Sequence, residues 1–312
     1  MDAPLALVAG GSRGLGLLIS RELLRRGHRV ALCARTRTQV DAAVELLSVH
    51  GRVTGHVVDV GDRTQVQELV SELERDHGPV EVLFSVAGVI QVGPAEAMTL
   101  DHFDEAVQTM LMGPVNLTWA VLPGMRSRRR GRIGTIGSIG GVVAPPHLLP
   151  YAAAKFGAVG FSEGLSSELS GTGVTATTVI PGLMRTGSHE MARMTGDQGA
   201  EYAWFAPAAS LPLLSMDAER AARAIVDATL AGRSRITLTV LAKIATRVHG
   251  LVPGTTSRAM GIVSRLLPGA PDEDTGTVLG HEAEEKLGSR TVRALTVLGS
   301  SAARRFNVRT GR

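Results

Sequence analysis

Three polar side chains in the middle of the chain have the types and the spacing for acid–base chemistry. Ser138 follows a predicted strand, and Tyr151 and Lys155 come 13 and 17 residues after it. On a helix, residues i and i+4 share a face, so Lys155 should lie beside the Tyr151 ring. Its positive charge would favour the phenolate and lower the pKa of Tyr151 from about 10. We therefore expect Tyr151 to exchange a proton with a carbonyl or hydroxyl oxygen that Ser138 holds by a hydrogen bond.

A glycine-rich segment after the first predicted strand has the composition of a nucleotide-binding loop. Gly10, Gly14 and Gly16 follow the spacing G-x-x-x-G-x-G. Glycine permits a tight turn and close approach of the backbone to a pyrophosphate, and the next helix points its N–H groups at the same place. A purely structural glycine turn is the alternative, but the apolar strand before it and the amphipathic helix after it favour a nucleotide.

The residues after the second predicted strand indicate which dinucleotide this loop would take. A protein that prefers NAD commonly has an acidic residue here, which binds the ribose 2′-hydroxyl. This chain has Ala34 followed by Arg35, with Arg13 in the glycine loop, and two guanidinium groups suit a 2′-phosphate. Asp59, after the third predicted strand, could accept a hydrogen bond from the adenine amino group or could be an ordinary turn residue. The sequence thus predicts NADP(H) in preference to NAD(H), with a pair of solvated surface arginines as the alternative.

Short apolar runs alternate with helix-like segments through the first 240 residues, which is typical of parallel βαβ units. We therefore predict a single α/β domain over residues 1–240, a Rossmann-type doubly wound parallel sheet of about seven strands with helices on both faces. Ligands of such a sheet bind beyond the carboxyl ends of the strands, where the glycine loop and Ser138 lie. The predicted strands are 5–8, 29–33, 53–60, 80–86, 132–136, 176–180 and 236–240, and the predicted helices are 17–26, 102–125 with a break at 113–114, 151–169 and 217–230.

Together these segments resemble the classical short-chain dehydrogenase/reductase family over residues 4–240. The matching pieces are AGGSRGLG at 9–16, the acid at position 59, GSIGG at 137–141, YAAAK at 151–155 and PGLMRT at 181–186. The resemblance implies hydride transfer between a nicotinamide and a carbonyl or alcohol, with the serine, tyrosine and lysine in the roles above, and it suggests a homodimer or homotetramer. It also implies that the backbone of Leu183 and the side chain of Thr186 hold the carboxamide. The full set of predicted cofactor contacts is Gly10, Ser12, Arg13, Gly14, Leu15, Gly16, Arg35, Asp59, Val60, Ala87, Gly88, Tyr151, Lys155, Pro181, Gly182, Leu183 and Thr186.

Two departures from the family pattern affect the predicted chemistry. The family usually has Asn-Asn-Ala-Gly after the fourth strand, where this chain has SVAG at 85–88. The family also usually has an asparagine in the next helix that helps hold a water in a proton relay to the lysine, and Met110 stands at this place. Asn116 is the alternative if the alignment shifts, although Gly113 argues against a shift. The rival hypothesis is therefore a catalytically weak or inactive nucleotide-binding protein of the same fold, with a regulatory or scaffold role.

Residues 187–215 follow the PGLMRT motif, and in the family this segment usually covers the substrate. Its large apolar side chains favour a lipophilic ketone or secondary alcohol, such as a steroid, a terpenoid or a fatty chain, while core or dimer packing explains them equally well. His147, in a loop before Tyr151, is expected at the surface rather than in the pocket. The apolar residues of the predicted lid are Met191, Met194, Tyr202, Trp204, Phe205, Leu211, Leu213 and Leu214.

Beyond residue 240 the alternation fades, and we interpret 241–312 as a largely helical extension that is packed on the core or peripheral. From 228 to 270 there is no Asp or Glu, and six basic residues give a local charge of +6. An apolar and basic stretch of this kind, at 236–267, could lie on an anionic membrane surface, or it could pack on the core or on a partner subunit. The basic residues are Arg233, Arg235, Lys243, Arg247, Arg258 and Arg265.

Composition argues against several other classes of protein. The 312 residues are 44% hydrophobic and 20% charged, with a net charge of +4, which is near the globular norm. Aromatic residues are only 3%, so stacking platforms are scarce and no nucleic-acid partner is expected. Cys33 is the single cysteine, so an intrachain disulfide cannot form. The first residues lack the pattern of a secretory signal peptide, and no apolar stretch reaches about 18 residues. We therefore expect a cytoplasmic protein, with peripheral membrane contact through 236–267 as an alternative. The sequence indicates no metal site.

Overall fold

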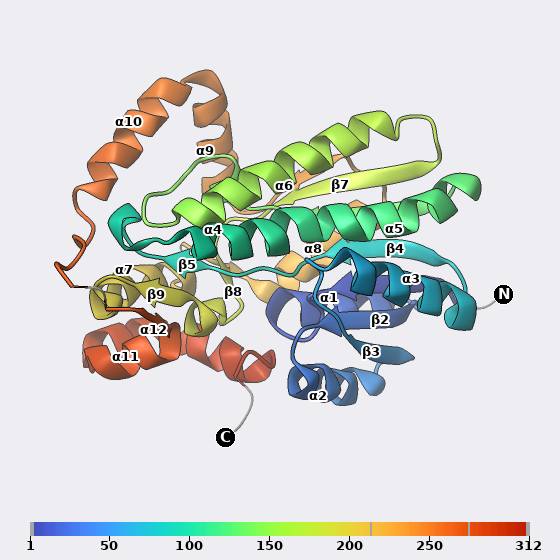
Figure 1. Cartoon of the computed structure of the whole chain (residues 1–312), viewed down its shortest axis with the longest axis horizontal. Coiled ribbons are helices and arrows are strands. Elements are labelled where there is room, and N and C mark those ends of the chain that lie inside the picture. Colours follow the sequence, from blue (N-terminus) through green and yellow to red (C-terminus); the bar gives the residue numbers. More distant parts are fainter. Residues whose placement is uncertain (1–2, 213, 274, 310–312) are drawn as a thin grey trace.

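A seven-stranded parallel sheet forms the centre of the protein (Figure 1). The computed structural model describes residues 3–212, 214–273 and 275–309, so Leu213 of the predicted lid, Asp274 of the extension and the two ends of the chain lie outside the described residues. The strands lie in the order β11-β7-β6-β4-β1-β2-β3 and all their pairings are parallel, which confirms the predicted fold. The strands are β1 (Leu5–Ala9), β2 (Arg29–Ala34), β3 (Val53–Val57), β4 (Val80–Ser85), β6 (Gly131–Ile136), β7 (Val174–Ile180) and β11 (Arg235–Thr237).

Both faces of this sheet are covered by helices. Along β1, Ala6 and Val8 join one core cluster, and Leu5, Leu7 and Ala9 join the other. Because successive side chains of a strand point to opposite faces, a strand that is buried on both sides is apolar at every position. The first cluster packs under α1 (Gly14–Arg25), α2 (Arg37–Ser48) and α8 (Ala218–Leu230), and the second under α3 (Arg63–His77), α5 (Gly113–Ser127) and α6 (Leu149–Glu168).

The long helix predicted over 102–125 is divided into three parts. It consists of α4 (Leu100–Val107), a π-helical turn (Gln108–Met112) and α5, and α5 begins at the predicted break. Pro114 stands in the first turn of α5, where its missing N–H and fixed φ are tolerated. The π turn brings Met110 to a buried position, and such turns are frequent beside functional sites.

Two strands end three residues earlier than the sequence pattern predicts. β3 ends at Val57 rather than at residue 60, because the chain turns at Asp59, whose Oδ1 accepts a hydrogen bond from Gly61 N at 2.9 Å. β11 ends at Thr237 rather than at residue 240. There Thr239 has a φ of 69°, and its hydroxyl accepts the N–H of Ala242 at 3.1 Å to begin the next helix.

The C-terminal part of the chain returns to the predicted lid. β12 (Thr277–Leu279) pairs antiparallel with β9 (Arg193–Thr195), which also pairs with β5 (Gln91–Val92). Two further helices, α11 (Gly280–Leu287) and α12 (Arg290–Arg305), pack on α7 (Gln198–Ser210) (Figure 1). The smaller elements are β8 (Met184–Arg185), β10 (Met216–Asp217) and the short 3-10 turns Ala95–Ala97, Ile139–Gly141 and Ser188–Met191.

Two helices between β11 and this returning segment lie at the periphery of the molecule. In Figure 1, α9 (Val240–Leu251) and α10 (Pro253–Ser264) project from the upper left of the molecule. Among the described residues, no helix is long and apolar enough to cross a membrane.

Candidate active site

The structure brings Ser138, Tyr151 and Lys155 together at the end of β6. Ser138 follows the strand and its Oγ accepts a hydrogen bond from Gly140 N at 3.0 Å. A Cβ placed on Gly140 would lie 3.1 Å from Cε1 of Tyr151 and 3.5 Å from Oγ of Ser138, so the ring and the hydroxyl border the same small space. The buried Lys155 Nζ donates to Ile136 O at 2.7 Å and lies 5.8 Å from the centre of the Tyr151 ring.

The acid–base balance of this group differs from the sequence expectation. Burial raises the pKa of Tyr151, and a hydrogen bond with Ser138 opposes the rise without reversing it. Burial also lowers the pKa of Lys155 to about 8. The expected lowering of the tyrosine pKa by the lysine is therefore wrong for this structure, because burial is the dominant influence on the phenol and the Lys155 ammonium is held by a backbone carbonyl. Tyr151 is a protonated phenol at neutral pH.

The glycine loop is packed so closely that Gly10 and Gly16 leave no room for a side chain. Gly10 has a φ of 83°, and a Cβ on it would lie 2.4 Å from Ala87 N. A Cβ on Gly16 would lie 1.9 Å from the Gly10 carbonyl oxygen. Leu15 is buried in the first turn of α1, and that turn contains no acidic residue, so the positive end of the helix favours an anion, although the N–H of Gly14 donates to Phe306 O in this structure. These features fit the pyrophosphate of a dinucleotide.

The two predicted phosphate-binding arginines lie close to each other. Burial lowers the pKa of Arg13, and the charge of Arg35 lowers it further. Arg35 is half exposed, and its Nη1 also lies 3.5 Å from Oε1 of Glu105 in α4. The same carboxylate binds Arg193. Glu105 was not among the predicted site residues, because it is 70 positions from Arg35 and its role depends on tertiary contact.

The turn after β3 involves Asp59 and also Asn116, the residue that a shifted alignment would place at the position of Met110. Besides its bond to Gly61, Asp59 donates its N–H to Oε1 of Gln65 at 3.0 Å, so Asp59 stabilises this turn through both its side chain and its backbone. Asn116 Nδ2 donates to the carbonyl oxygens of Val60 at 3.1 Å and Gly61 at 3.2 Å, and is therefore engaged at this turn.

Met110, rather than an asparagine, occupies the place beside the tyrosine. It is buried in a cluster with Ala106 and Ala154, and Tyr151 packs against this cluster. A Cβ on Gly88 would lie 3.4 Å from its sulfur. A thioether in this position gives no hydrogen-bond donor for a water near Lys155.

The predicted carboxamide turn is tied to the active-site loop and to the lid. The carbonyl oxygen of Pro181 accepts a hydrogen bond from Ile139 N at 2.8 Å, and that of Leu183 accepts one from Met216 N at 2.8 Å. A Cβ on Gly182 would collide with the Thr239 hydroxyl at 2.4 Å. Thr186 is buried, and its hydroxyl accepts a bond from the Ser188 amide at 3.4 Å.

The C-terminal segment reaches the glycine loop, a contact that the sequence did not indicate. Gly14 N donates to Phe306 O at 2.8 Å. Asn307 Nδ2 donates to Ser12 O at 2.8 Å and to Gln39 O at 3.1 Å, so it joins the loop to α2. A Cβ on Gly14 would lie 3.8 Å from both Val308 and Thr186. The extension therefore forms one side of the predicted cofactor site.

His147 is buried, which corrects the expectation that it lies at the surface. Its side chain is 6% exposed, and Nδ1 lies 2.7 Å from Oε1 of the fully buried Glu201 in α7. The other carboxylate oxygen accepts a bond from Trp204 Nε1 at 2.7 Å. This network ties the loop before Tyr151 to the lid helix.

The predicted lid contributes large side chains to a core cluster next to Tyr151. Met194, Tyr202 and Phe205 are buried in one cluster with Ala283 of the extension, as the packing interpretation expects. Tyr151 and partly exposed apolar residues pack against the same cluster, among them Ile90, Trp204, Val278, Leu287 and Val292.

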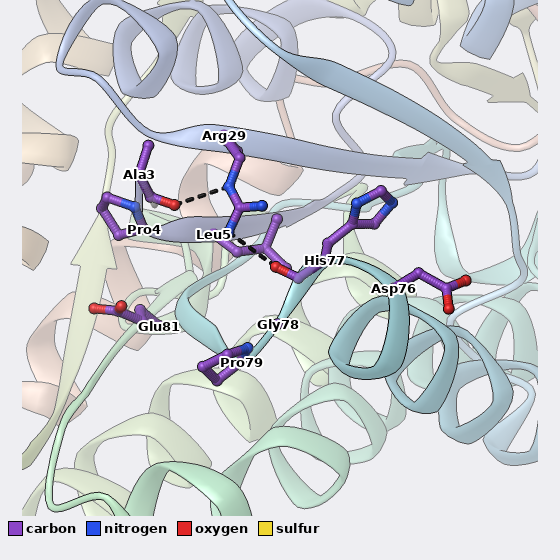
Figure 2. A pocket seen from close by; sticks show the side chains of 9 residues that line it. All are labelled: Ala3, Pro4, Leu5, Arg29, Asp76, His77, Gly78, Pro79 and Glu81. Atoms are coloured by element: carbon purple, nitrogen blue, oxygen red, sulfur yellow. Dashed lines mark hydrogen bonds between the residues drawn. The ribbon is translucent and has the colours of Figure 1, made fainter. Parts of the chain in front are cut away.

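The pocket in Figure 2 lies at the opposite end of the strands. It is lined by residues near the amino ends of β1, β2 and β4. Arg29 crosses it, donating to Ala3 O at 2.8 Å and to His77 O at 2.9 Å. Because the glycine loop and Ser138 follow the carboxyl ends of their strands, this pocket is separate from the candidate active site.

Known proteins share this architecture and sequence pattern. A family model described as short chain dehydrogenase matches residues 4–196. The 3-oxoacyl-acyl-carrier-protein reductase MabA of Mycobacterium avium is 37% identical over 180 residues, which cover 58% of this chain and 67% of that protein. The 3-oxoacyl-acyl-carrier-protein reductase FabG of Escherichia coli is 31% identical over 196 residues, which cover 63% of this chain and 78% of that protein. A crystal structure of a variant actinorhodin polyketide ketoreductase with NADPH has a TM-score of 0.65 and 28% identity, and the match covers 77% of this chain and 96% of that chain.

Proposed function

The chain belongs to the short chain dehydrogenase family and is an oxidoreductase with a nicotinamide cofactor, and from this premise we propose a finer assignment. It is an NADP(H)-dependent enzyme that transfers hydride between the nicotinamide and a lipophilic ketone or secondary alcohol. Tyr151 acts as the general acid and base. The observation that carries the proposal is the meeting of the Ser138 hydroxyl and the Tyr151 ring at Gly140.

Tyr151 holds the proton that the reaction moves. Its raised pKa keeps the phenol protonated at neutral pH. In the reducing direction, Tyr151 donates this proton to the substrate oxygen, while the Ser138 hydroxyl donates a hydrogen bond to the same oxygen. The bound nicotinamide supplies the hydride. Lys155 is largely protonated at pH 7 with a pKa of about 8, so its charge offsets the negative charge that Tyr151 acquires.

The cofactor would be held at three places along the chain. The glycine loop and the first turn of α1 would bind the pyrophosphate through backbone N–H groups. The turn at 181–186 would hold the carboxamide. Arg13 and Arg35 would bind the 2′-phosphate, and Ala34 places no carboxylate there to repel it.

The apolar surroundings of Tyr151 support a lipophilic substrate. Ile90, Trp204 and Val292 pack on the same apolar cluster as Tyr151, so the ring lies in largely apolar surroundings. The relatives named above are reductases of 3-oxoacyl groups and of a polyketide. We extend this class to the present chain, as a ketone carried on an apolar chain or ring system.

The rival function is a nucleotide-binding protein with weak or no turnover. Met110 beside Tyr151 and the unpartnered hydroxyl of Ser85 favour it, since both replace amide side chains that are usual in the family. Both functions require cofactor binding, so turnover discriminates them.

The decisive experiment is a substrate panel followed by nicotinamide absorbance. Aliphatic, cyclic and steroidal ketones and 3-oxoacyl thioesters are each offered with NADPH and with NADH, and the alcohols with the oxidised cofactors. Tyr151→Phe is the control, because it keeps the ring and removes the proton. We expect NADPH oxidation with apolar ketones by the wild type alone. Cofactor binding without turnover of any compound would support the rival, and failure to bind either cofactor would contradict both.

The family premise also leads us to propose a homodimer or homotetramer. Light scattering on the purified chain measures the mass directly. A monomer at micromolar concentration would contradict this proposal and leave the assignment of the reaction untouched.

A further inference from the structure

Helix α9 presents its apolar side to solvent. The side that faces the protein carries small or polar residues, with Ala242 buried and Ala245, Thr246 and His249 half-buried. A surface helix normally buries its apolar stripe, so this arrangement is inverted. The outward side carries Val240, Leu241, Ile244, Val248 and Leu251, with Leu251 82% exposed.

Helix α10 continues the exposed apolar surface. None of its residues is buried, and Ile262, Val263 and, just beyond its end, Leu266 are exposed. The two helices contact each other and project together from the molecule (Figure 1). We call the large exposed aliphatic residues of this pair the α9–α10 surface: Val240, Leu241, Ile244, Val248, Leu251, Val252, Ile262, Val263 and Leu266. An apolar patch of this kind on a water-soluble fold marks an interaction site.

The charged residues carried by α9 and α10 themselves are all basic. The sequence from 228 to 270 contains no acidic residue. Lys243, Arg247, Arg258 and Arg265 are exposed, and within the described part of the chain none of them forms a salt bridge. Four unneutralised cations therefore lie on the two helices that carry the aliphatic side chains.

We propose that the α9–α10 surface docks on a lipid bilayer that contains anionic headgroups. Amphipathic helices with aliphatic residues on one side and Lys or Arg beside them lie in the interface of such bilayers. The cations meet the negative headgroups and the aliphatic side chains enter the acyl boundary. A second copy of the chain fits less well, because a symmetric interface would bring the same cations together with no acid in either segment to neutralise them.

The surface lies next to the active-site loops. Helix α9 contacts the turn Ile139–Gly141, which directly follows Ser138. Thr239, just before α9, lies against Gly182 of the predicted carboxamide turn. If the proposed function is correct, docking brings the substrate side of the enzyme close to the membrane, where a lipophilic ketone is concentrated. The docking itself does not depend on that function.

Co-sedimentation of the full chain with liposomes tests the proposal. The vesicles are phosphatidylcholine alone or phosphatidylcholine with phosphatidylglycerol, at low and at high salt. We expect sedimentation with the anionic vesicles only, and weaker sedimentation at high salt because the attraction is screened. Equal recovery in the supernatant with both vesicles at low salt would overturn the proposal.

Paired variants distinguish binding through the α9–α10 surface from non-specific binding to vesicles. Leu251→Asp with Leu266→Asp places two acids on the surface and should reduce binding to anionic vesicles at least tenfold. Val49→Asp is the matched control, since Val49 is 81% exposed outside the surface, and it should bind like the wild type. Retained NADPH binding and an unchanged melting temperature show that each variant is folded. If the double variant changes the oligomeric mass and the wild type binds no vesicle, the surface is a subunit interface and the proposal is wrong. Loss of vesicle binding in Val49→Asp as well would also overturn it.

Discussion

Replacing Arg35 by alanine should weaken NADPH binding and leave NADH binding almost unchanged. The side chain follows β2 and lies close enough to Arg13 to lower the pKa of that guanidinium. Two like charges held near each other are stabilised when an anion binds between them. NADH has no phosphate at this position, so only the NADPH complex should respond.

The structure limits the size of the effect. A hydrogen bond to a charged group contributes about 1.5–3 kcal/mol. Arg35 is 47% exposed, and its guanidinium already lies 3.5 Å from the Glu105 carboxylate. When NADPH binds, the 2′-phosphate therefore replaces an existing partner of Arg35 at a partly solvated position. We therefore expect the lower end, about 1.5 kcal/mol, which corresponds to roughly a tenfold increase in the NADPH dissociation constant.

Fluorescence titration of both cofactors measures this directly. Arg37→Ala is the matched control, because this arginine is two residues away, 68% exposed and paired only loosely with Asp41 at 4.0 Å. Ala34→Asp should shift the preference further, by repelling the phosphate and offering NADH a ribose partner. A wild type that prefers NADH, or an Arg35→Ala variant that loses both cofactors equally, would show that these arginines are surface charges.

Four further predictions concern the site and its supports. Tyr151→Phe should lower kcat at least about a hundredfold while the cofactor dissociation constants measured by titration stay the same; an unchanged kcat would end the assignment of Tyr151. Met110→Asn should raise turnover or leave it unchanged, and a collapse of activity in the folded variant would show that the methionine serves the existing site. The pKa of Lys155 is about 8 in the folded chain and 10.5 in the unfolded chain, so between these pH values folding releases a proton and the free energy of unfolding rises with pH. Denaturant titration of the wild type, compared with Lys155→Met, should show a gain of at most about 3 kcal/mol from pH 8 to 10.5. Parallel pH dependence in the two proteins would refute this. Asn307→Ala should lower the free energy of unfolding by about 1–2 kcal/mol, since it breaks two hydrogen bonds. Asn307→Gly should be less destabilised, because glycine suits the φ of 55° at this position. An equal loss of stability in both variants would show that the left-handed backbone conformation costs no free energy.

The central sheet was predictable because its strands carry a local signal. The central strands β1, β2 and β4 are short and mostly apolar, and parallel pairing buries both of their faces. Helix α3 was not among the predicted helices, although Val66, Leu69, Val70 and Leu73 form one buried stripe with helical spacing. The spacing of Tyr151 and Lys155 predicted their common face correctly, because i and i+4 positions meet on any helix.

Contacts between distant segments were not predictable in this way. Glu105 at Arg35, Glu201 at His147 and the return of Asn307 to the glycine loop each join positions that no periodicity relates. The pKa of Tyr151 was predicted with the wrong sign for a related reason. A sequence shows which charge is near, but the cost of removing a phenol from water depends on the tertiary packing.

Met110, one of the departures from the family pattern, reaches the site from a different element than the acid–base residues do. Ser138 and the carbonyl that holds Lys155 both belong to the end of β6, and a Cβ on Gly141 would lie 2.5 Å from Lys155 O, so α6 packs directly on this turn. Met110 approaches Tyr151 from the π turn between α4 and α5. Under the proposed function, a change there would alter the path by which a proton reaches Lys155 and would leave the position of the donor itself unchanged. The methionine should therefore affect the rate at which Tyr151 is reprotonated, while the substrate oxygen still receives its proton from the same hydroxyl.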